Sequence, residues 1–238
     1  MFRFTIFGIP VQVEPLFWLV MAYIGGGFYA LKSNSPAAYT GVLLFMMAGF
    51  ISVLGHELGH ALVGWKRGGG RVWIKLWAFG GLAYHQGGRL DRRNRCAMIL
   101  AGPGAGLAMA AISLIALFII FPAPEAIQRM EIYLRYTMVP HEYLLPAFPD
   151  DRPIYGFLNA MIWVNVWWSI MNLVPVFPLD GGQFMDQFVK SRRTMHKVSM
   201  IACGVVMLIM LSRGMTMGLI FFAYFAYQNF NGYREARY

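Results

Sequence analysis

The segment ISVLGHELGHALVG, residues 51–64, places two histidines and a glutamate inside an otherwise apolar stretch. Ionisable side chains are costly to bury in hydrocarbon, so within a membrane span they indicate a functional site. His56 and His60 are four residues apart, which on a helix makes them neighbours on one face and a ready pair of metal ligands. Glu57 is turned by about 100° around the helix axis, so it can act as a general base on water without binding the metal.

A catalytic zinc site needs a third protein ligand and one open position. Lys66 follows His60 by six residues, or about 9 Å of helix, so the motif lies near one end of its span. Asp180, in NLVPVFPLDGG, ends a later span on the same predicted side, and two prolines interrupt the helix before it, so its carboxylate can turn inward. We expect Asp180 to be the third ligand. His85 is the alternative ligand, and a turn aspartate is the alternative interpretation of Asp180.

The two histidines could instead be hydrogen-bonded core residues of a helix bundle. That interpretation leaves three ionisable groups in hydrocarbon with no compensating metal, so we favour the metal site. Gly55 and Gly59 directly precede the histidines at a spacing typical of close helix packing, which is the role we expect for them. Access of a substrate backbone to the metal is the alternative.

Six apolar stretches must position these groups, and they predict an all-α polytopic membrane protein with about six transmembrane helices. The fifth stretch, and to a lesser degree the first, is short for a hydrocarbon core of about 30 Å. If the N-terminus is cytoplasmic, 15 of the 20 lysines and arginines lie in cytoplasmic segments. This bias predicts a multi-pass protein of the cell membrane with both termini, and the active site, toward the cytoplasm. The stretches cover residues 16–31, 42–65, 96–121, 154–176, 198–211 and 215–230.

Three regions that connect or precede the spans have sequence patterns unlike those of a membrane-spanning helix. Residues 1–14 alternate and turn at a Gly-Ile-Pro, which predicts a strand-turn, and residues 71–88 alternate around Gly80-Gly81, which predicts a reentrant hairpin. Together they predict a small membrane-associated β-hairpin or sheet, since non-helical backbone at membrane depth must be buried in protein or line a cavity. Residues 122–153 favour an interfacial helix. We expect residues 1–238 to form a single integral-membrane domain.

Composition agrees with the membrane class. The chain is 58% hydrophobic and only 13% charged, against about 25% charged in a soluble domain. The net charge of +9 comes from residues that flank the spans, so we expect no nucleic-acid partner. Cys96 and Cys203 form no CxxC pair and are expected to be buried thiols. The N-terminus shows no cleavable signal pattern.

Five segments in order resemble the site-2 protease family of intramembrane zinc metalloproteases (peptidase M50-like). They are FGIPVQVEPLFWL, GHELGHALVG, FGGLAYHQ, AGPGAGL and NLVPVFPLDGG. The resemblance implies one Zn²⁺ per chain, held by His56, His60 and Asp180, with Glu57 as the base. It also implies that Asn172 helps to position or polarise the scissile carbonyl; taken without the family, Asn172 is equally a helix-packing amide.

The chain departs from the family's pattern in two ways. Gly106 stands in the third span where many relatives carry Asn, so we expect no catalytic role for that segment. The sequence contains no PDZ or CBS module of the kind found in several branches, so we expect a compact form.

The resemblance and the motifs together predict a zinc metalloendopeptidase that hydrolyses a peptide bond in or near a transmembrane segment of a membrane protein. The strand edge of the hairpin could pair with an unwound substrate segment. The alternative function is a membrane metal transporter or a non-proteolytic metal-binding membrane protein, whereas an inactive relative is disfavoured by the intact Glu57. The expected partners are a transmembrane protein or peptide substrate and the lipid bilayer, with a regulatory membrane partner or a homo-oligomer left open.

Overall fold

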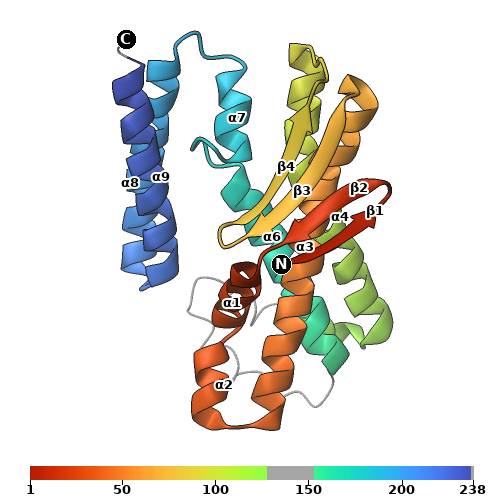
Figure 1. Ribbon diagram of the computed structural model, residues 1–238. Coiled ribbons are helices and arrows are strands. Elements are labelled where there is room, and N and C mark those ends of the chain that lie inside the picture. The colour runs from red at the N-terminus through yellow and green to blue at the C-terminus, as the bar shows by residue number, and fades with distance from the viewer. Residues whose placement is uncertain (128–152, 237–238) are drawn as a thin grey trace.

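The computed structural model describes residues 1–127 and 153–236. Long helices stand side by side and a small sheet lies over one side of them (Figure 1). The fold class is therefore the expected one, a helical membrane protein with a small sheet. In chain order the elements are β1 (Phe2–Ile6), β2 (Ile9–Val13), α1 (Pro15–Ile24), α2 (Gly27–Ser33), α3 (Pro36–Gly68), β3 (Arg71–Trp77), β4 (Gly80–Gln86), α4 (Arg92–Ile120), α6 (Pro153–Asn172), α7 (Asp180–Asp186), α8 (Arg192–Ser212) and α9 (Thr216–Glu235).

The four strands form one sheet in the order β1-β2-β3-β4. β1 and β2 are antiparallel and joined by Phe7-Gly8, both with positive φ, as a tight two-residue hairpin turn requires. β3 and β4 form a second antiparallel hairpin. β2 and β3 then pair in parallel over residues 11–13 and 74–76, which joins the two hairpins. The sequence predicted the two strand pairs and a small hairpin or sheet, but not the parallel pairing of β2 with β3.

One face of the sheet packs on the helices because alternate strand residues point the same way. The buried residues of β2 and β3 are at most 2% exposed, and they form a core with α1 and α3. On the other face, Lys75 of β3 pairs with Glu14 at 2.7 Å, and the hydrogen bond to that carboxylate raises the pKa of Lys75. The core residues are Ile9, Val11, Val13, Phe17, Met21, Val53, Leu54, Ala61, Ile74 and Leu76.

Four described helices are long and apolar enough to cross a membrane, namely α3, α4, α6 and α8. α3 has 33 residues, or about 50 Å of helix, so it extends past a hydrocarbon core of about 30 Å. α1 and α2 together pass the same test as a pair bent by 65°. α9 has 20 residues but is not among these helices. The expected total of six spans therefore stays a prediction.

The first and the fifth expected spans differ from the helices that form. The stretch 16–31 is broken at Gly25-Gly26, where Gly26 has φ 86°, a left-handed conformation that ends one helix before the next begins. The stretch 198–211 belongs to α8, which begins earlier, at Arg192, and has 21 residues. The helix is therefore longer than the apolar stretch that predicted it, because it includes the basic residues that precede this stretch.

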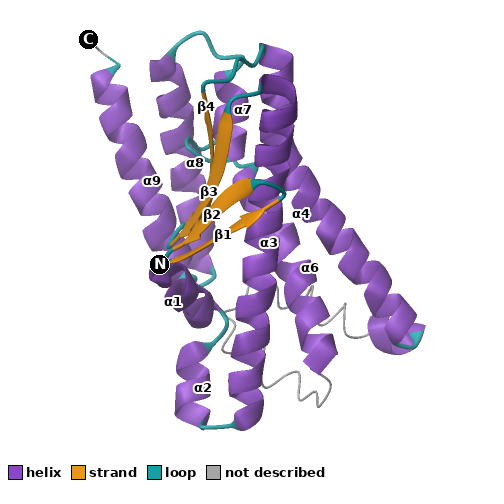
Figure 2. Ribbon diagram, turned by 45° about the vertical axis from the view of Figure 1, so that its right-hand side comes forward, coloured by secondary structure: helices purple, strands orange, loops and turns teal. Residues whose placement is uncertain are grey.

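α3 is the central helix and packs against α4, α6 and the sheet. Gly55 and Gly59 both face α4: a Cβ on Gly59 would overlap the carbonyl oxygen of Ala101, and one on Gly55 would lie 2.5 Å from Cε of Met109. These glycines therefore allow close helix packing, the role expected for them. α8 and α9 pack on each other at one side of the molecule, as both views show (Figures 1 and 2).

The fourth expected span ends earlier than its apolar run. α6 stops at Asn172, residues 173–179 form an irregular loop, and α7 begins at Asp180. The loop contains the two prolines expected to end the helix. The interfacial helix expected within residues 122–153 falls largely on residues outside the described part of the chain.

Candidate metal centre

Three side chains from two distant segments meet inside the helix bundle. His56 and His60 come from α3, and Asp180 is the first residue of α7. Oδ2 of Asp180 lies 3.1 Å from Nε2 of His56 and 3.3 Å from Nε2 of His60, and the two Nε2 atoms are 3.1 Å apart. All three residues are at most 8% exposed. Within the described residues this is the one group of His, Cys, Asp or Glu side chains arranged to hold a metal ion.

The donor set fits zinc. Two imidazole nitrogens and one carboxylate oxygen are three protein ligands of the kind that catalytic zinc sites use, with a fourth position left open. A tetrahedral ion with bonds of about 2.0–2.2 Å holds its ligand atoms about 3.3–3.6 Å apart. The observed separations of 3.1–3.3 Å are within a few tenths of an ångström of that spacing. The cluster could thus hold one metal ion with little rearrangement.

The two histidines are held differently. Nδ1 of His60 lies 2.8 Å from the carbonyl oxygen of Met98 on α4, so Nδ1–H donates and Nε2 is left for a metal. Nδ1 of His56 has no hydrogen-bond partner among the described residues. His56 instead contacts the ring of Trp168 of α6 edge-on, with centroids 6.4 Å apart.

Glu57 lies beside the cluster but is not part of it. It is 5% exposed and faces β4, where the backbone N–H of Ala83 interacts with its carboxyl group. A Cβ on Gly81 would overlap the Glu57 side chain, so β4 can approach this closely only with glycine at that position. The hairpin therefore borders the metal centre directly, and Gly81 sets its distance from Glu57.

Two further glycines make room for the centre. A Cβ on Gly102 of α4 would overlap the imidazole of His60, and one on Gly80 would overlap the Trp168 ring. Sequence reasoning expected no catalytic role for the AGPGAGL segment, and it missed that Gly102 gives His60 its space. The sequence shows Gly102 as part of a Gly-Pro pair inside an apolar span, but it does not indicate that this glycine contacts His60.

Asp180 is placed by tight packing where α7 begins. Cβ atoms on Gly181 and Gly182 would overlap backbone atoms of the preceding loop, including the carbonyl oxygen of Leu173 and the nitrogen of Phe177. The loop is also closed by a hydrogen bond of 2.7 Å from Leu179 N to the carbonyl oxygen of Val176. The two glycines after Asp180 thus fold α7 back against its own loop.

The remaining candidates are located outside the cluster. Nε2 of His85, the alternative ligand, lies 2.6 Å from the carbonyl oxygen of Gly69, so this histidine ties β4 to the end of α3. Asn172 is 8% exposed, and its Nδ2 donates to the carbonyl oxygen of Trp168 one helical turn earlier, at 2.8 Å. Asn172 is the last residue of α6 and precedes Asp180 by eight residues, so it lies directly before the loop that leads to Asp180.

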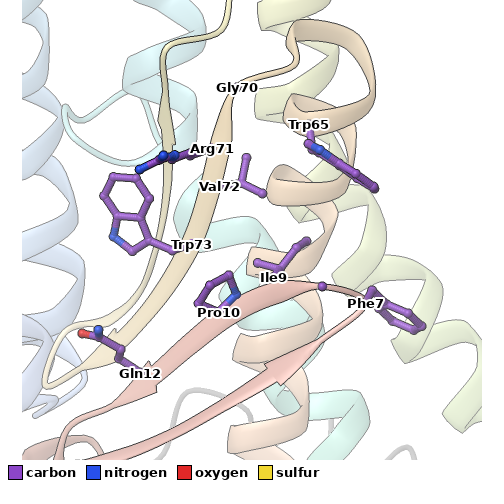
Figure 3. Close-up of a pocket in the computed structure, with 10 residues that line it drawn as sticks. Phe7, Ile9, Pro10, Gln12, Trp65, Gly70, Arg71, Val72 and Trp73 are labelled. Carbon is purple, nitrogen blue, oxygen red and sulfur yellow. The ribbon is translucent and has the colours of Figure 1, made fainter.

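A separate groove of about 590 Å³ opens where β2 and β3 diverge (Figure 3). Phe7 lies at its rim in the β1–β2 turn, Trp65 comes from the end of α3, and Arg71 and Trp73 extend from β3. No ligand-cluster residue, nor Glu57, lines this groove. It therefore belongs to the outer part of the sheet and not to the metal centre.

Fold and site together define a polytopic membrane protein in which an HExxH helix and a distant aspartate form one buried cluster that could hold a metal ion. The model of peptidase family M50 matches residues 44–212, a range that contains all three residues of the cluster, and the chain belongs to this family. The resemblance inferred from the sequence motifs is thus confirmed.

Two curated relatives and one solved structure support this placement. The chain is 27% identical over 190 residues to the putative zinc metalloprotease sll0528 of Synechocystis sp., covering 78% of this chain and 43% of that protein. It is 26% identical over 238 residues to the zinc metalloprotease MJ0392 of Methanocaldococcus jannaschii, covering 98% of this chain and 60% of that protein. The chain thus spans about half the length of these relatives.

The solved structure is a site-2 protease from Methanocaldococcus jannaschii. It matches with a TM-score of 0.57 at 23% identity, covering 99% of this chain and 93% of that one. At this identity the match shows that the two chains share a fold.

Proposed function

We propose that residues 1–238 act as one membrane-embedded zinc endopeptidase, which hydrolyses a peptide bond in or near a transmembrane segment of a membrane protein. The observation that carries this proposal is the convergence of His56, His60 and Asp180 with Glu57 beside them, all buried within the helix bundle. Membership of peptidase family M50 and the names of the two relatives support the same activity.

Each residue has a proposed role. His56, His60 and Asp180 hold one Zn²⁺, which when bound supplies Lewis-acid polarisation of the scissile carbonyl and of water. Glu57 takes the proton from the attacking water and passes it to the leaving amine. Asn172 positions the scissile carbonyl; its Nδ2 uses one N–H on the Trp168 carbonyl, which leaves the second N–H for substrate.

Substrate presentation is proposed to use the edge of the sheet. A helical substrate hides its carbonyls in intrahelical hydrogen bonds, so the segment to be cut must first unwind. β4 is an edge strand, and it lies against Glu57 at Gly81 and Ala83. An unwound segment that pairs with this edge is placed beside the proposed base, a strand-addition mode in which backbone hydrogen bonds provide the affinity.

The proposed orientation has both termini and the metal centre toward the cytoplasm. The excess of lysine and arginine in the corresponding segments supports it. The C-terminal ends of α9 and α3 lie at the same end of the bundle (Figures 1 and 2), which agrees with the part of this orientation that has the C-terminus and the metal centre on one side of the membrane.

The test compares the membrane proteomes of cells that produce the wild-type protein with those that produce Glu57→Gln. We expect uncleaved membrane fragments to accumulate with the variant, and purified wild-type protein to contain one zinc per chain. Zinc-loaded wild-type protein that cleaves no membrane protein, or a Glu57→Gln variant that cleaves at the wild-type rate, would contradict the proposal. The first outcome would favour a non-proteolytic metal-binding protein.

A further inference from the structure

The loop that carries Asp180 is held at one residue, Phe177, by side chains from two other helices. The backbone N–H of Phe177 donates to Oγ of Ser199 on α8, at 3.0 Å. The carbonyl oxygen of Phe177 accepts from Nδ2 of Asn229 on α9. Ser199 and Asn229 are 0% and 1% exposed, so both bonds are shielded from solvent.

The amide of Asn229 is held in one orientation. Its Nδ2 also donates to the carbonyl oxygen of Phe225, at 2.8 Å, so two acceptors face this nitrogen. Oδ1 then faces Nδ1 of His196 at 2.9 Å, and Nδ1–H must donate because Oδ1 only accepts. A Cβ on Gly232 would overlap the His196 imidazole, so this glycine lets the ring lie against α9. We call Ser199, Asn229 and His196 the Phe177 clamp.

The clamp is linked to Asp180 by short, closely packed contacts. Phe177 precedes Asp180 by three residues, and the loop between them is closed by the Leu179–Val176 hydrogen bond of 2.7 Å. Gln183 of α7 donates to the carbonyl oxygen of Pro178 at 2.9 Å, and Gly182 packs directly on the Phe177 nitrogen. A displacement of Phe177 therefore moves the start of α7 as well.

We propose that Ser199, Asn229 and His196 are positioning residues for the third metal ligand, so that α8 and α9 set the place of Asp180 through the backbone of Phe177. The proposal rests on the proposed role of Asp180 in holding zinc. Buried polar side chains in membrane helices are costly unless they are paired, and here two of them bind the backbone N–H and C=O of a single residue of the loop before Asp180. General helix association would not require the backbone of that residue as the partner.

The test measures Zn²⁺ affinity and the absorption spectrum of the Co²⁺-substituted full-length protein in detergent. Ser199→Ala removes the acceptor of the Phe177 N–H, and Ser199→Thr keeps a hydroxyl. Ser113→Ala is the matched control, because Ser113 is also a buried serine of a long helix but donates to a carbonyl of its own helix, that of Met109. Asn229→Ala removes the second contact.

We expect Zn²⁺ binding to weaken by about 10–100-fold in Asn229→Ala, the range found when residues that orient metal ligands are removed. In Ser199→Ala we expect a loss of about 3–10-fold, which corresponds to one neutral hydrogen bond. The Co²⁺ spectrum should change in both variants and remain that of the wild type in Ser199→Thr and Ser113→Ala. If Asn229→Ala does not fold, the two Ser199 variants still decide the question.

Ser199→Ala with the Zn²⁺ affinity and Co²⁺ spectrum of Ser113→Ala would overturn the positioning role. Wild-type protein that binds no Zn²⁺ or Co²⁺ would instead overturn the proposed metal centre itself. Since neither measurement depends on cleavage, failure of the positioning role is distinguished from failure of the proposed enzymatic activity.

Discussion

The two sides of the metal centre are built in different ways. On one side, His56 and His60 belong to a single uninterrupted helix of 33 residues, and their separation follows from helical geometry alone. On the other side, Asp180 begins a helix of seven residues after an irregular loop, and side chains from α8 and α9 hold that loop.

This difference shows which interactions fix the positions of the three side chains of the cluster. The α3 side is set locally, because the two histidines keep their spacing as long as the helix persists. The α7 side is set by tertiary contacts, because a loop and a short helix cannot fix a ligand without them. The α3 side should thus respond mainly to changes beside the histidines, whereas the α7 side should also respond to changes in α8 and α9, far from Asp180 in the sequence.

The largest effect should come from removing a ligand on either side. We expect His60→Ala and Asp180→Ala each to weaken Zn²⁺ binding by roughly 10²–10³-fold, since three ligands share the total binding energy, and each to abolish cleavage. Zinc content after dialysis and a cleavage assay measure both. If one of these variants kept full zinc occupancy and activity, the proposal that α3 and α7 both supply metal ligands would be contradicted.

Glu57→Gln should separate chemistry from metal binding on the α3 side. Glu57 is on the same helix but outside the ligand cluster, so we expect zinc affinity to stay within a few-fold of the wild type. Cleavage should fall by about 10²–10⁴-fold, the usual contribution of a general base. Loss of zinc together with activity would instead make Glu57 a ligand.

The same difference explains what the sequence could predict. The arrangement of His56, Glu57 and His60 could be predicted because the three lie within five residues, and the geometry of a helix then determines how their side chains are placed. Asp180 was predicted because it ends a span on the same predicted side of the membrane as the histidines, after two prolines that interrupt the helix. The contact between Asn229 and Phe177 was not predicted. The two residues are 52 positions apart, and the sequence around a single polar residue in an apolar helix does not indicate which group it binds.

In the sheet, too, local features could be predicted from the sequence but contacts between distant residues could not. Alternation and glycine breaks predicted each hairpin locally. The parallel pairing of Val11 with Ile74 joins residues far apart in the chain, and it depends on how α1 and α3 bring the two hairpins together. The break in the first apolar stretch was marked by three consecutive glycines, 25–27, which hydropathy alone does not distinguish from a continuous span.

A pair of glycines on α4 offers an internal test of how closely the α3 side is packed. A Cβ on Gly102 would overlap the His60 imidazole, whereas one on Gly104 would meet open space. We expect Gly102→Ala to weaken zinc binding and cleavage by about 10–100-fold, because it displaces a ligand. Gly104→Ala should leave both unchanged and stabilise the helix by up to about 1 kcal/mol.

Chelator competition and the midpoint of thermal unfolding measure these two effects in the same preparations. Equal zinc affinity in Gly102→Ala and Gly104→Ala would show that His60 can move aside, and that the α3 side is as adjustable as the α7 side.

The smallest effect is expected for a variant that tests which contact of α9 determines the position of Asp180. Besides the Phe177 clamp, α9 contacts the β3–β4 turn, where the rings of Phe79 and Tyr224 stack 5.2 Å apart. Phe79→Ala removes this stacking, which is worth about 0.5–1.5 kcal/mol, so we expect a slightly lower unfolding midpoint. Zinc affinity should stay within about twofold of the wild type, because the hydrogen bonds to Phe177 remain. A loss of zinc affinity as large as that in Ser199→Ala would mean that the overall seating of α9, and not the two bonds to Phe177, determines where Asp180 lies.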